Sequence, residues 1–302
     1  MSDFAIIIPF YKIDFFEETL KSVVTQTNRN FTLYIGNDAS PDDPLPLIEK
    51  YFKEGDYHYF DYKENLGGKN LALQWERILE NITEDWFQIL GDDDLISNNF
   101  VEEFYKNLHL ADSHHSNVIK ISQCFINETS ETTNEFTNYA KISSSKLIWR
   151  SKYLEKHRSS LSEHIFRTKT YHKYKFKPFP LAWYSDDLAV LEFSEGKGII
   201  FINEAKVYVR MSSLNISSLT NNDAEKKKAK HEYLEIILNK YSYLLKKEEL
   251  IKEFDDYLYL TWKNKYPTKL NFSRIYLKTK HWYTILKIPY QKYLLNKNAR
   301  IK

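Results

Sequence analysis

The sequence is organised around residues 86–95, which read Trp86-Phe87-Gln88-Ile89-Leu90-Gly91-Asp92-Asp93-Asp94-Leu95. The short apolar and aromatic run before Gly91 predicts a buried strand rather than a helix. The polar residues at 97–99 lead into an amphipathic helix that begins at Phe100. The three aspartates are therefore expected at the carboxyl end of a strand, which is where open α/β sheets bind ligands.

Three adjacent carboxylates repel one another unless a cation or hydrogen-bond donors offset their charge. Oxygen ligands of this kind suit Mg²⁺ or Mn²⁺, which proteins usually bind through one or two carboxylates together with the phosphates of a substrate. The alternative interpretation is a solvated acidic turn at the start of the helix. Only the rest of the sequence can distinguish the two.

The composition excludes several classes of protein. The formal net charge of +2 gives no general reason to expect a nucleic-acid partner, and the 7 glycines exclude collagen-like or glycine-linker architectures. The single cysteine, Cys124, excludes an intrachain disulfide and a multi-cysteine zinc site, and is expected to be buried in a strand. The sequence has no signal-peptide pattern and no apolar run long enough to span a membrane, so a cytoplasmic location is expected.

Strands and helices are predicted to alternate over about the first hundred residues. The apolar run at 4–9 is typical of a strand buried on both faces of a parallel sheet. Further strands are predicted at 31–36, 57–60 and 86–90, and helices at 15–27, 44–53 and 67–81. This alternation gives parallel strands with right-handed crossovers, so the predicted fold class is α/β with a doubly wound, Rossmann-like sheet.

Candidate ligand groups follow the predicted strands. Pro9 and Tyr11 follow the first predicted strand, and the Tyr11 ring can stack on a base. Asp38 can accept hydrogen bonds from a base or ribose. Asn65 and Lys69 lie near a helix start, where Lys69 can neutralise phosphate. Each has a structural alternative: a core aromatic, a turn residue and a plain loop before a helix. Together with the aspartates they favour a site for a nucleoside diphosphate and a metal.

Four motifs stand at these strand ends: Ile6-Ile7-Ile8-Pro9-Phe10-Tyr11, Asn37-Asp38-Ala39-Ser40-Pro41-Asp42, Asn65-Leu66-Gly67-Gly68-Lys69-Asn70 and Leu90-Gly91-Asp92-Asp93-Asp94. In order and spacing they resemble the successive motifs of the inverting family 2 glycosyltransferases of bacterial polysaccharide synthesis, which have the GT-A fold with a mixed sheet. The resemblance is strong over about the first hundred residues, weaker to about residue 217, and absent beyond.

The resemblance implies roles for the acids. Asp38 would read the nucleotide base, usually uracil, and the element from Asp92 to Asp94 would hold ribose and a divalent metal, Mn²⁺ or Mg²⁺. On this basis Asp92 and Asp93 are assigned to the nucleotide, and Asp92 and Asp94 to the metal. Two departures from the family pattern, Ala39 in place of a common glycine and Gly91 in place of a common aspartate, leave the division of labour among the three acids open.

The second half of the predicted catalytic domain holds fewer signals. Strands are predicted at 117–127 and 162–167, a surface loop at 128–138 and a helix at 146–156. His164 is a weak acceptor-binding or acid–base candidate, because a lone histidine is more often structural. Trp183 and Tyr184 suit the floor of a sugar subsite, and packing in the core is the alternative.

Asp186 and Asp187 open a further predicted helix. Ser185 or Asp186 can cap that helix, which is the structural interpretation of the pair. The family resemblance implies instead that the second acid of such a pair deprotonates the acceptor hydroxyl, so Asp187 is the predicted base and Asp186 its neighbour in the catalytic set.

The stretch 199–211 predicts a pair of strands broken at Asn203-Glu204. The family often ends this segment with Arg and His ahead of a serine-rich loop that closes over the diphosphate. Arg210 matches that arginine, and Lys69 or Arg210 would stabilise the departing diphosphate. Ser212 stands at the histidine position, and whether it replaces a metal-ligating histidine is left open by the sequence.

The domain prediction is a catalytic domain at 1–217, with a nucleotide-binding half at 1–96 and an acceptor-binding half at 97–217, followed by a helical extension at 218–302. Helices are predicted at 225–241 and 246–263, and then a final helical segment. Between 270 and 302 the chain carries basic and aromatic residues and no acid, which is typical of a segment lying on an anionic membrane surface. A solvated basic face is the alternative.

The predicted activity is transfer of a sugar from a nucleoside-diphosphate donor, most often a UDP-sugar in this family, to a hydroxyl of a glycan or lipid-linked glycan. A sugar-nucleotide pyrophosphorylase is a second possible enzyme class. Such an enzyme would require a Gly- and Arg-rich phosphate loop after the first strand, and residues 9–12 are not such a loop. A binding module that keeps the fold without turnover is the third interpretation.

Overall fold

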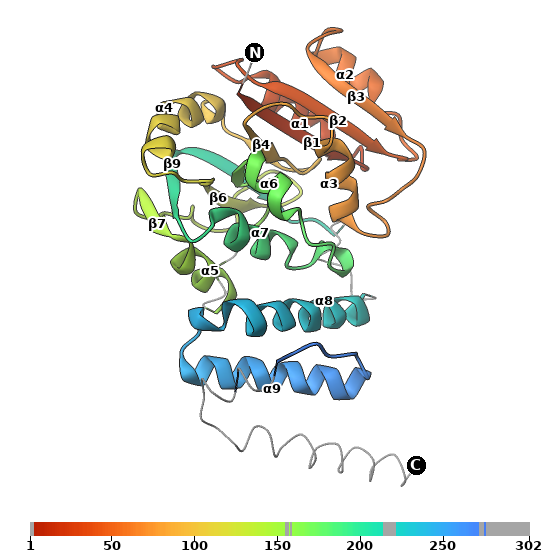
Figure 1. Cartoon of the computed structure of the whole chain (residues 1–302). Helices are drawn as coiled ribbons and strands as arrows, with labels where there is room; N and C mark the ends of the chain where they lie inside the picture. Colours follow the sequence, from red (N-terminus) through yellow and green to blue (C-terminus); the bar gives the residue numbers. More distant parts are fainter. Residues whose placement is uncertain (1–2, 155–156, 158, 214–221, 272–274, 276–302) are drawn as a thin grey trace. The chain divides into compact units, whose positions relative to one another are not determined.

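The computed structural model describes residues 3–154, 157, 159–213, 222–271 and 275, and the chain forms two compact units, Met1–Thr220 and Asn221–Lys302 (Figure 1). Across these described ranges, no helix combines the length and the apolar character that crossing a membrane requires.

A mixed sheet forms the centre of the first unit, and its described residues make nine strands in the order β3-β2-β1-β4-β8-β6-β9-β5, with β7 paired to β9. The strands are β1 Phe4–Phe10, β2 Thr32–Asp38, β3 Tyr57–Tyr62, β4 Trp86–Ile89, β5 Leu95–Ile96, β6 Val118–Ile126, β7 Ile142–Ser144, β8 His164–Arg167 and β9 Gly198–Arg210. The first four strands in sequence are mutually parallel. The α/β prediction is therefore confirmed.

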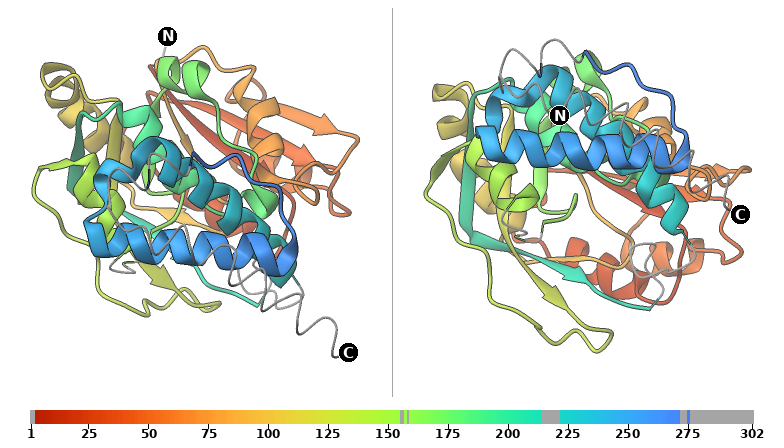
Figure 2. Two further views of the ribbon diagram at one scale, coloured as in Figure 1. Left: turned by 60° about the horizontal axis from the view of Figure 1, so that its bottom comes forward. Right: turned by 90° about the horizontal axis from the view of Figure 1, so that it is seen from below.

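Helices cover both faces of this sheet (Figures 1 and 2). They are α1 Phe16–Val24, α2 Leu45–Tyr51, α3 Leu71–Leu79, α4 Phe100–Ser113, α5 Ser145–Tyr153, α6 Thr168–Tyr174 and α7 Ser185–Ser194. Successive residues of a strand point to opposite faces. Phe4, Ile6 and Ile8 accordingly join a core with α1, α2 and α4, while Ala5 and Ile7 join a second core with α3, α6 and α7. Burial on both faces explains the uninterrupted apolar run of β1.

Strand direction determines which loops meet. Strand β8 is antiparallel to both β4 and β6, and β6 is parallel to β9. The carboxyl ends of β1, β2, β4, β6 and β9 therefore share one edge of the sheet with the amino end of β8. This edge collects Tyr11, Asp38, the three aspartates, Arg210 and the segment around Ser162, which come from distant parts of the sequence.

Two predictions in this unit were wrong in detail. Strand β9 is continuous, and the register of its pairing with β6 shifts from Ile121↔Ile202 to Ser122↔Lys206, so a bulge absorbs the predicted break at Asn203-Glu204. Helix α3 begins at Leu71 rather than at Gly67, because Asn70 accepts a hydrogen bond from the backbone N–H of Ala72 at 3.0 Å and caps it. Cys124 is buried in β6, as predicted.

The described part of the second unit is helical. Helix α8 Asp223–Ile236 continues through a π-helical turn, Ile237–Tyr241, and α9 Lys247–Asn264 lies alongside α8 (Figure 2). The His231 ring stacks on Tyr257 at 4.6 Å and joins the two helices. Nearly all of the basic and aromatic segment, 272–274 and 276–302, lies outside the described residues, so its membrane contact stays a prediction.

Gly36 on β2 tests the packing of α3 on the sheet. A Cβ at this position would lie 2.5 Å from Cδ1 of Ile78 and 2.6 Å from its Cγ1. We expect Gly36→Ala to lower the free energy of unfolding by about 1–3 kcal/mol, because overpacking forces neighbouring side chains to move. Urea denaturation measures this change.

A double variant provides the control. Ile78→Ala removes both clashing carbons, so Gly36→Ala combined with Ile78→Ala should cost less than the sum of the two single changes. Additive costs would mean that the clash is relieved elsewhere.

Candidate active site

Asp92 fastens the end of β4 to the end of β1. Its Oδ2 accepts hydrogen bonds from the backbone N–H groups of Tyr11 and Lys12, both at 2.8 Å. The carbonyl of Tyr11 in turn accepts a hydrogen bond from Ser40 Oγ at 2.7 Å, which brings in the loop after β2. Asp92 therefore holds three strand ends together, and the exposed ring of Tyr11 stands beside them.

Asp94 fastens the same edge on its other side. Its Oδ1 accepts the backbone N–H of Arg210 at 2.9 Å, and its Oδ2 accepts the hydroxyl of Ser162. The carboxyl group is buried, and burial raises its pKa to about 6 although Ser162 and Arg210 oppose that change. Both oxygens of Asp94 are therefore occupied by protein donors.

The Arg210 side chain is fully buried and contacts several elements of the fold. Its Nε donates to the carbonyl of Asp93 at 3.0 Å, and its guanidinium pairs with Glu18 at 2.7 Å and lies over the Phe15 ring at 4.2 Å. These contacts bind the end of β9 to the aspartates and to α1. The sequence predicted a contact with diphosphate, and the structure instead directs these donors at protein groups.

Asp93 differs from its neighbours. Among the described residues none donates a hydrogen bond to its carboxylate, and its pKa is raised well above the usual range by burial and then by the charges of Asp94 and Asp92. Lys12 and Arg210 oppose this only in part. Asp93 is consequently the carboxylate of this cluster that most needs a cation or a proton.

A divalent metal fits this site only with ligands from elsewhere. Within the described ranges, no group of three or more His, Cys, Asp and Glu side chains is placed to hold a metal ion. One unsatisfied carboxylate among hard oxygen donors suits Mg²⁺ or Mn²⁺ bound mainly by substrate phosphates and water. The assignment of the metal to Asp92 and Asp94 fits less well, because protein donors already bind both.

Asp38 clamps the loop that precedes α3. Its carboxylate accepts the backbone N–H groups of Leu66 at 2.8 Å and Gly67 at 2.7 Å, and pairs with Arg77. A side chain at Gly67 would place Cβ 2.5 Å from Asp38 Oδ2, so only glycine fits there. Burial raises the pKa of Asp38, while these three donors lower it. Arg77, which also stacks on the Tyr62 ring at 3.8 Å, was missed by the sequence analysis.

Other predicted residues lie on the rim of this loop. Asn65 accepts a hydrogen bond from the Gly68 N–H, and Lys69 is exposed and pairs with Glu64. Ala39, which follows Asp38, has a φ of 53°, in the left-handed region that favours glycine. The backbone thus explains why a glycine is common at that position in the family.

Asp186 and Asp187 share one ammonium group. Lys152 Nζ on α5 lies 2.5 Å from Asp186 Oδ2 and 3.2 Å from Asp187 Oδ1. Burial raises the pKa of Asp187 to about 6, Lys152 lowers it and Asp186 raises it. A carboxylate with a pKa near neutrality suits a general base.

The capping prediction was wrong. The residue at the N-cap of α7 is Tyr184, with a φ of 71° and no side-chain cap, and the Ser185 hydroxyl donates instead to the Lys177 carbonyl at 2.6 Å. Leu181 and Ala182 also have positive φ, at 58° and 53°. Such strain in residues other than glycine concentrates at functional sites.

The predicted acceptor residues fall into two groups. Trp183 and Tyr184 are partly buried in the strained turn ahead of the acidic pair. His164 is buried, its Nδ1 lies 2.8 Å from the Ser160 carbonyl, and burial followed by the charges of Lys120 and Lys152 lowers its pKa well below the usual range. A neutral, enclosed imidazole favours the structural interpretation of His164.

The sequence profile described as Glycosyl transferase family 2 matches residues 5–179, which is more than half of the chain. The chain belongs to glycosyl transferase family 2. This confirms the family predicted from the four strand-end motifs and sets aside the pyrophosphorylase alternative.

Two curated relatives match part of the chain. An uncharacterised glycosyltransferase of Rickettsia typhi is 32% identical over 110 residues, which is 36% of this chain and 33% of that protein. The glycosyltransferase GlyA of Streptococcus pneumoniae is 27% identical over 104 residues, 34% of this chain and 14% of that protein. The matched stretch thus spans a third or less of either relative.

Solved structures show the same fold. Residues 1–349 of S. aureus TarS align with a TM-score of 0.60 and 17% identity, over 95% of this chain and 79% of that one. The same TarS fragment in complex with UDP-GlcNAc aligns with a TM-score of 0.63 and 18% identity, over 87% and 73%. The fold of this glycosyltransferase is GT-A.

Arg77 provides a test of the loop clamp. Arg77→Met leaves the buried carboxylate of Asp38 without its cation, and we expect the free energy of unfolding to fall by about 3 kcal/mol, as when one partner of a buried pair is removed. Nucleotide binding, measured by calorimetry, should weaken as the loop loosens.

Lys69→Met is the matched control, because Lys69 forms an exposed ion pair on the same loop. Exposed pairs contribute little, so the stability of this variant should match the wild type. Equal losses in both variants would contradict a clamp centred on Asp38.

Proposed function

We propose that the chain transfers a sugar from a UDP-sugar to a hydroxyl of a glycan or lipid-linked glycan, with inversion, in bacterial surface polysaccharide synthesis. The observation that carries the donor site is Asp93, a partly buried carboxylate to which no described residue donates a hydrogen bond, at the strand edge shared with Asp38 and Tyr11. Family membership and the UDP-GlcNAc complex of a neighbour with the same fold support this donor class. The predicted cytoplasmic location, with peripheral membrane contact through the C-terminal segment, belongs to the same proposal.

The donor would bind across the strand ends. Tyr11 presents an exposed ring on which the base can stack, and Asp38 holds the loop beside it in place. Asp93 would hold Mg²⁺ or Mn²⁺ together with the diphosphate, and the ion would offset the charge that develops on the leaving group. Asp92 and Asp94 position Asp93 through their backbone and hydroxyl contacts.

Asp187 would act as the base. The acceptor hydroxyl loses its proton to the Asp187 carboxylate while its oxygen forms a bond to the anomeric carbon of the sugar. The bond from that carbon to the diphosphate oxygen breaks on the opposite side, and both its electrons leave with UDP. One such in-line displacement inverts the configuration at the anomeric carbon.

Donor choice is tested by UDP, GDP or dTDP release from a panel of the corresponding nucleotide sugars with Mn²⁺ or Mg²⁺, beginning with UDP-GlcNAc. Selective turnover of UDP-sugars is the expected result. Nucleotide binding with no turnover in the presence of glycan acceptors would favour the binding-module interpretation instead.

Asp93→Asn should remove the metal dependence of UDP binding. The wild type should bind UDP more tightly in Mn²⁺ than in EDTA by calorimetry, and the variant should bind it equally in both, because a neutral amide attracts the cation far less.

Asp94→Asn is the comparison, because protein donors occupy both oxygens of Asp94. We expect it to lower the melting temperature and to keep the effect of Mn²⁺. The opposite pattern would return the metal to Asp94, as the sequence first suggested.

Asp187→Asn should lower kcat by about 10²–10⁴-fold, which is the usual contribution of a general base. UDP affinity should be nearly unchanged, because the residue acts on the proton of the acceptor. In the wild type, kcat/KM should fall as pH drops below about 6, where the Asp187 carboxylate becomes protonated. Normal turnover by Asp187→Asn would remove this residue from the mechanism.

A further inference from the structure

Lys152 belongs to a group of buried and partly buried charges behind the acidic pair. The group combines α5, the start of α7, β6 and the turn before β8. On its far side, Lys120 Nζ lies 3.1 Å from Glu163 Oε1, and both side chains are buried. Among the described residues, the charged and titratable side chains that interact with Lys152 or with the acidic pair are Lys120, Glu163, His164, Asp186 and Asp187.

Counted over the described residues, the charges of this group do not balance. Two ammonium groups, Lys120 and Lys152, face three carboxylates, and the neutral imidazole of His164 adds nothing. Glu163 is satisfied by Lys120 and by the Ser160 backbone N–H at 2.9 Å and Ser160 hydroxyl at 2.8 Å. The surplus negative charge therefore lies on Asp186 and Asp187, which share the single ammonium of Lys152.

We propose that Lys152 is the positioning residue of the catalytic pair: its ammonium orients the Asp187 carboxylate and keeps it charged, so that it can accept the acceptor proton. This inference rests on the proposed function of Asp187. Lys152 donates to both acids from a helix 34 residues earlier in the chain, so it also fixes the strained turn that carries them.

Lys152 and Asp186 change the pKa of Asp187 in opposite directions. Burial raises the pKa of Asp187, Lys152 lowers it, and Asp186 raises it. The pKa of Lys152 itself is raised by Asp186 and Asp187 despite its burial, so it stays charged throughout the working pH range. Lys152 thus favours the charged base, and Asp186 favours the protonated one.

Two variants should move the pH profile in opposite directions. In Lys152→Met, the acidic limb of kcat/KM for UDP release from UDP-GlcNAc, or from the UDP-sugar found most active, should move up by about 1–3 pH units, because a cation at this distance lowers an aspartate pKa by that amount. The variant should be about five-fold or more slower at pH 6 and approach the wild type at alkaline pH. Asp186→Asn should move the limb to lower pH.

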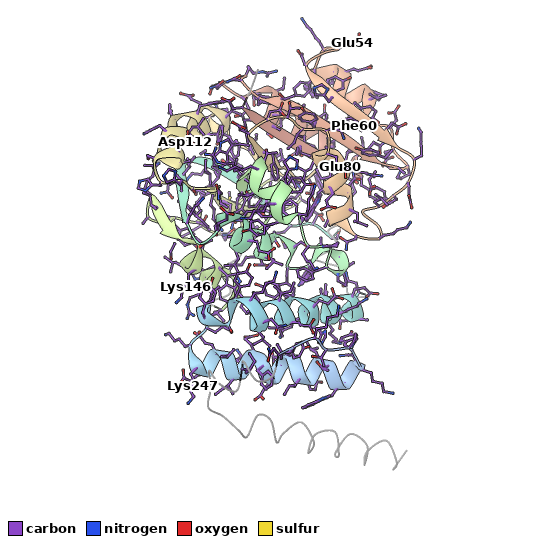
Figure 3. The ribbon with its side chains drawn as sticks, viewed as in Figure 1. Glu54, Phe60, Glu80, Asp112, Lys146 and Lys247 are labelled. Atoms are coloured by element: carbon purple, nitrogen blue, oxygen red, sulfur yellow. The ribbon has the colours of Figure 1, made fainter. Side chains whose placement is uncertain are left out.

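Two control variants distinguish the loss of the Lys152 charge from a general effect on the fold. Lys146 lies on the same helix and is exposed (Figure 3), so Lys146→Met should reproduce the wild-type profile. Lys152→Arg keeps the positive charge and should keep the limb within a few tenths of a pH unit. A purely structural role for Lys152 would lower kcat/KM equally at every pH.

A second experiment measures the titration of the acidic pair in the absence of turnover. The ¹³C resonances of the aspartate carboxyl groups, followed by NMR against pH, report the Asp187 pKa directly when Asp187→Asn is used for assignment. We expect this pKa to rise in Lys152→Met, to fall in Asp186→Asn and to stay unchanged in Lys146→Met. If Lys152→Met does not fold, the Asp186→Asn shift and the unchanged Lys152→Arg profile still test the proposal.

The outcomes distinguish this inference from the proposed function. If Asp187→Asn retains turnover, the base assignment fails, whatever Lys152 does. If Asp187→Asn loses turnover but the pH profile and the Asp187 titration of Lys152→Met coincide with those of the wild type, the role of Lys152 is overturned while the proposed function stands.

Discussion

The hydrogen bonds from the backbone N–H groups of Tyr11 and Lys12 to Asp92 are the contact on which the site depends. Parallel strands bring their carboxyl ends to one edge but leave the loops there without mutual hydrogen bonds. A charged acceptor that binds two N–H groups of a neighbouring loop supplies them, and charge-assisted bonds are stronger than neutral ones. Through Ser40 and Thr19, which contact the Tyr11 and Asp92 carbonyls, the same contact orders the loop after β2 and helix α1.

The three consecutive aspartates divide their work because successive side chains leave the backbone in different directions. Asp92 meets the end of β1, Asp94 meets β9 and the turn before β8, and Asp93 remains without a protein donor among the described residues. Two carboxylates stabilise the edge, and the third is the one that we propose to hold a cation. Because only neutral donors hold the outer two carboxylates, their charges still repel that of Asp93, and this repulsion supports the cation that we propose there.

The acidic pair at the start of α7 is also held by a specific contact, here with the Lys152 ammonium. A side-chain cap would have consumed Asp186 or Ser185, whereas the left-handed Tyr184 begins the helix without one. Both acids are therefore directed to Lys152, at a cost in backbone strain across Leu181, Ala182 and Tyr184. Strain of this kind persists only where surrounding contacts over-determine it, and the shared ammonium is one such contact.

The sequence by itself determined the alternation of strands and helices, the strand-end position of the aspartates and the family, because apolar period and motif order are local properties of the chain. It could not determine that Asp38 meets Arg77 across 39 residues, that Asp94 meets Arg210 across 116, or that Lys152 serves both Asp186 and Asp187. Those contacts depend on strand order and on the antiparallel insertion of β8, which no local pattern encodes. Capping, predicted for Asp186 from its place at a helix start, failed because tertiary ion pairing with Lys152 prevailed over the local hydrogen bond.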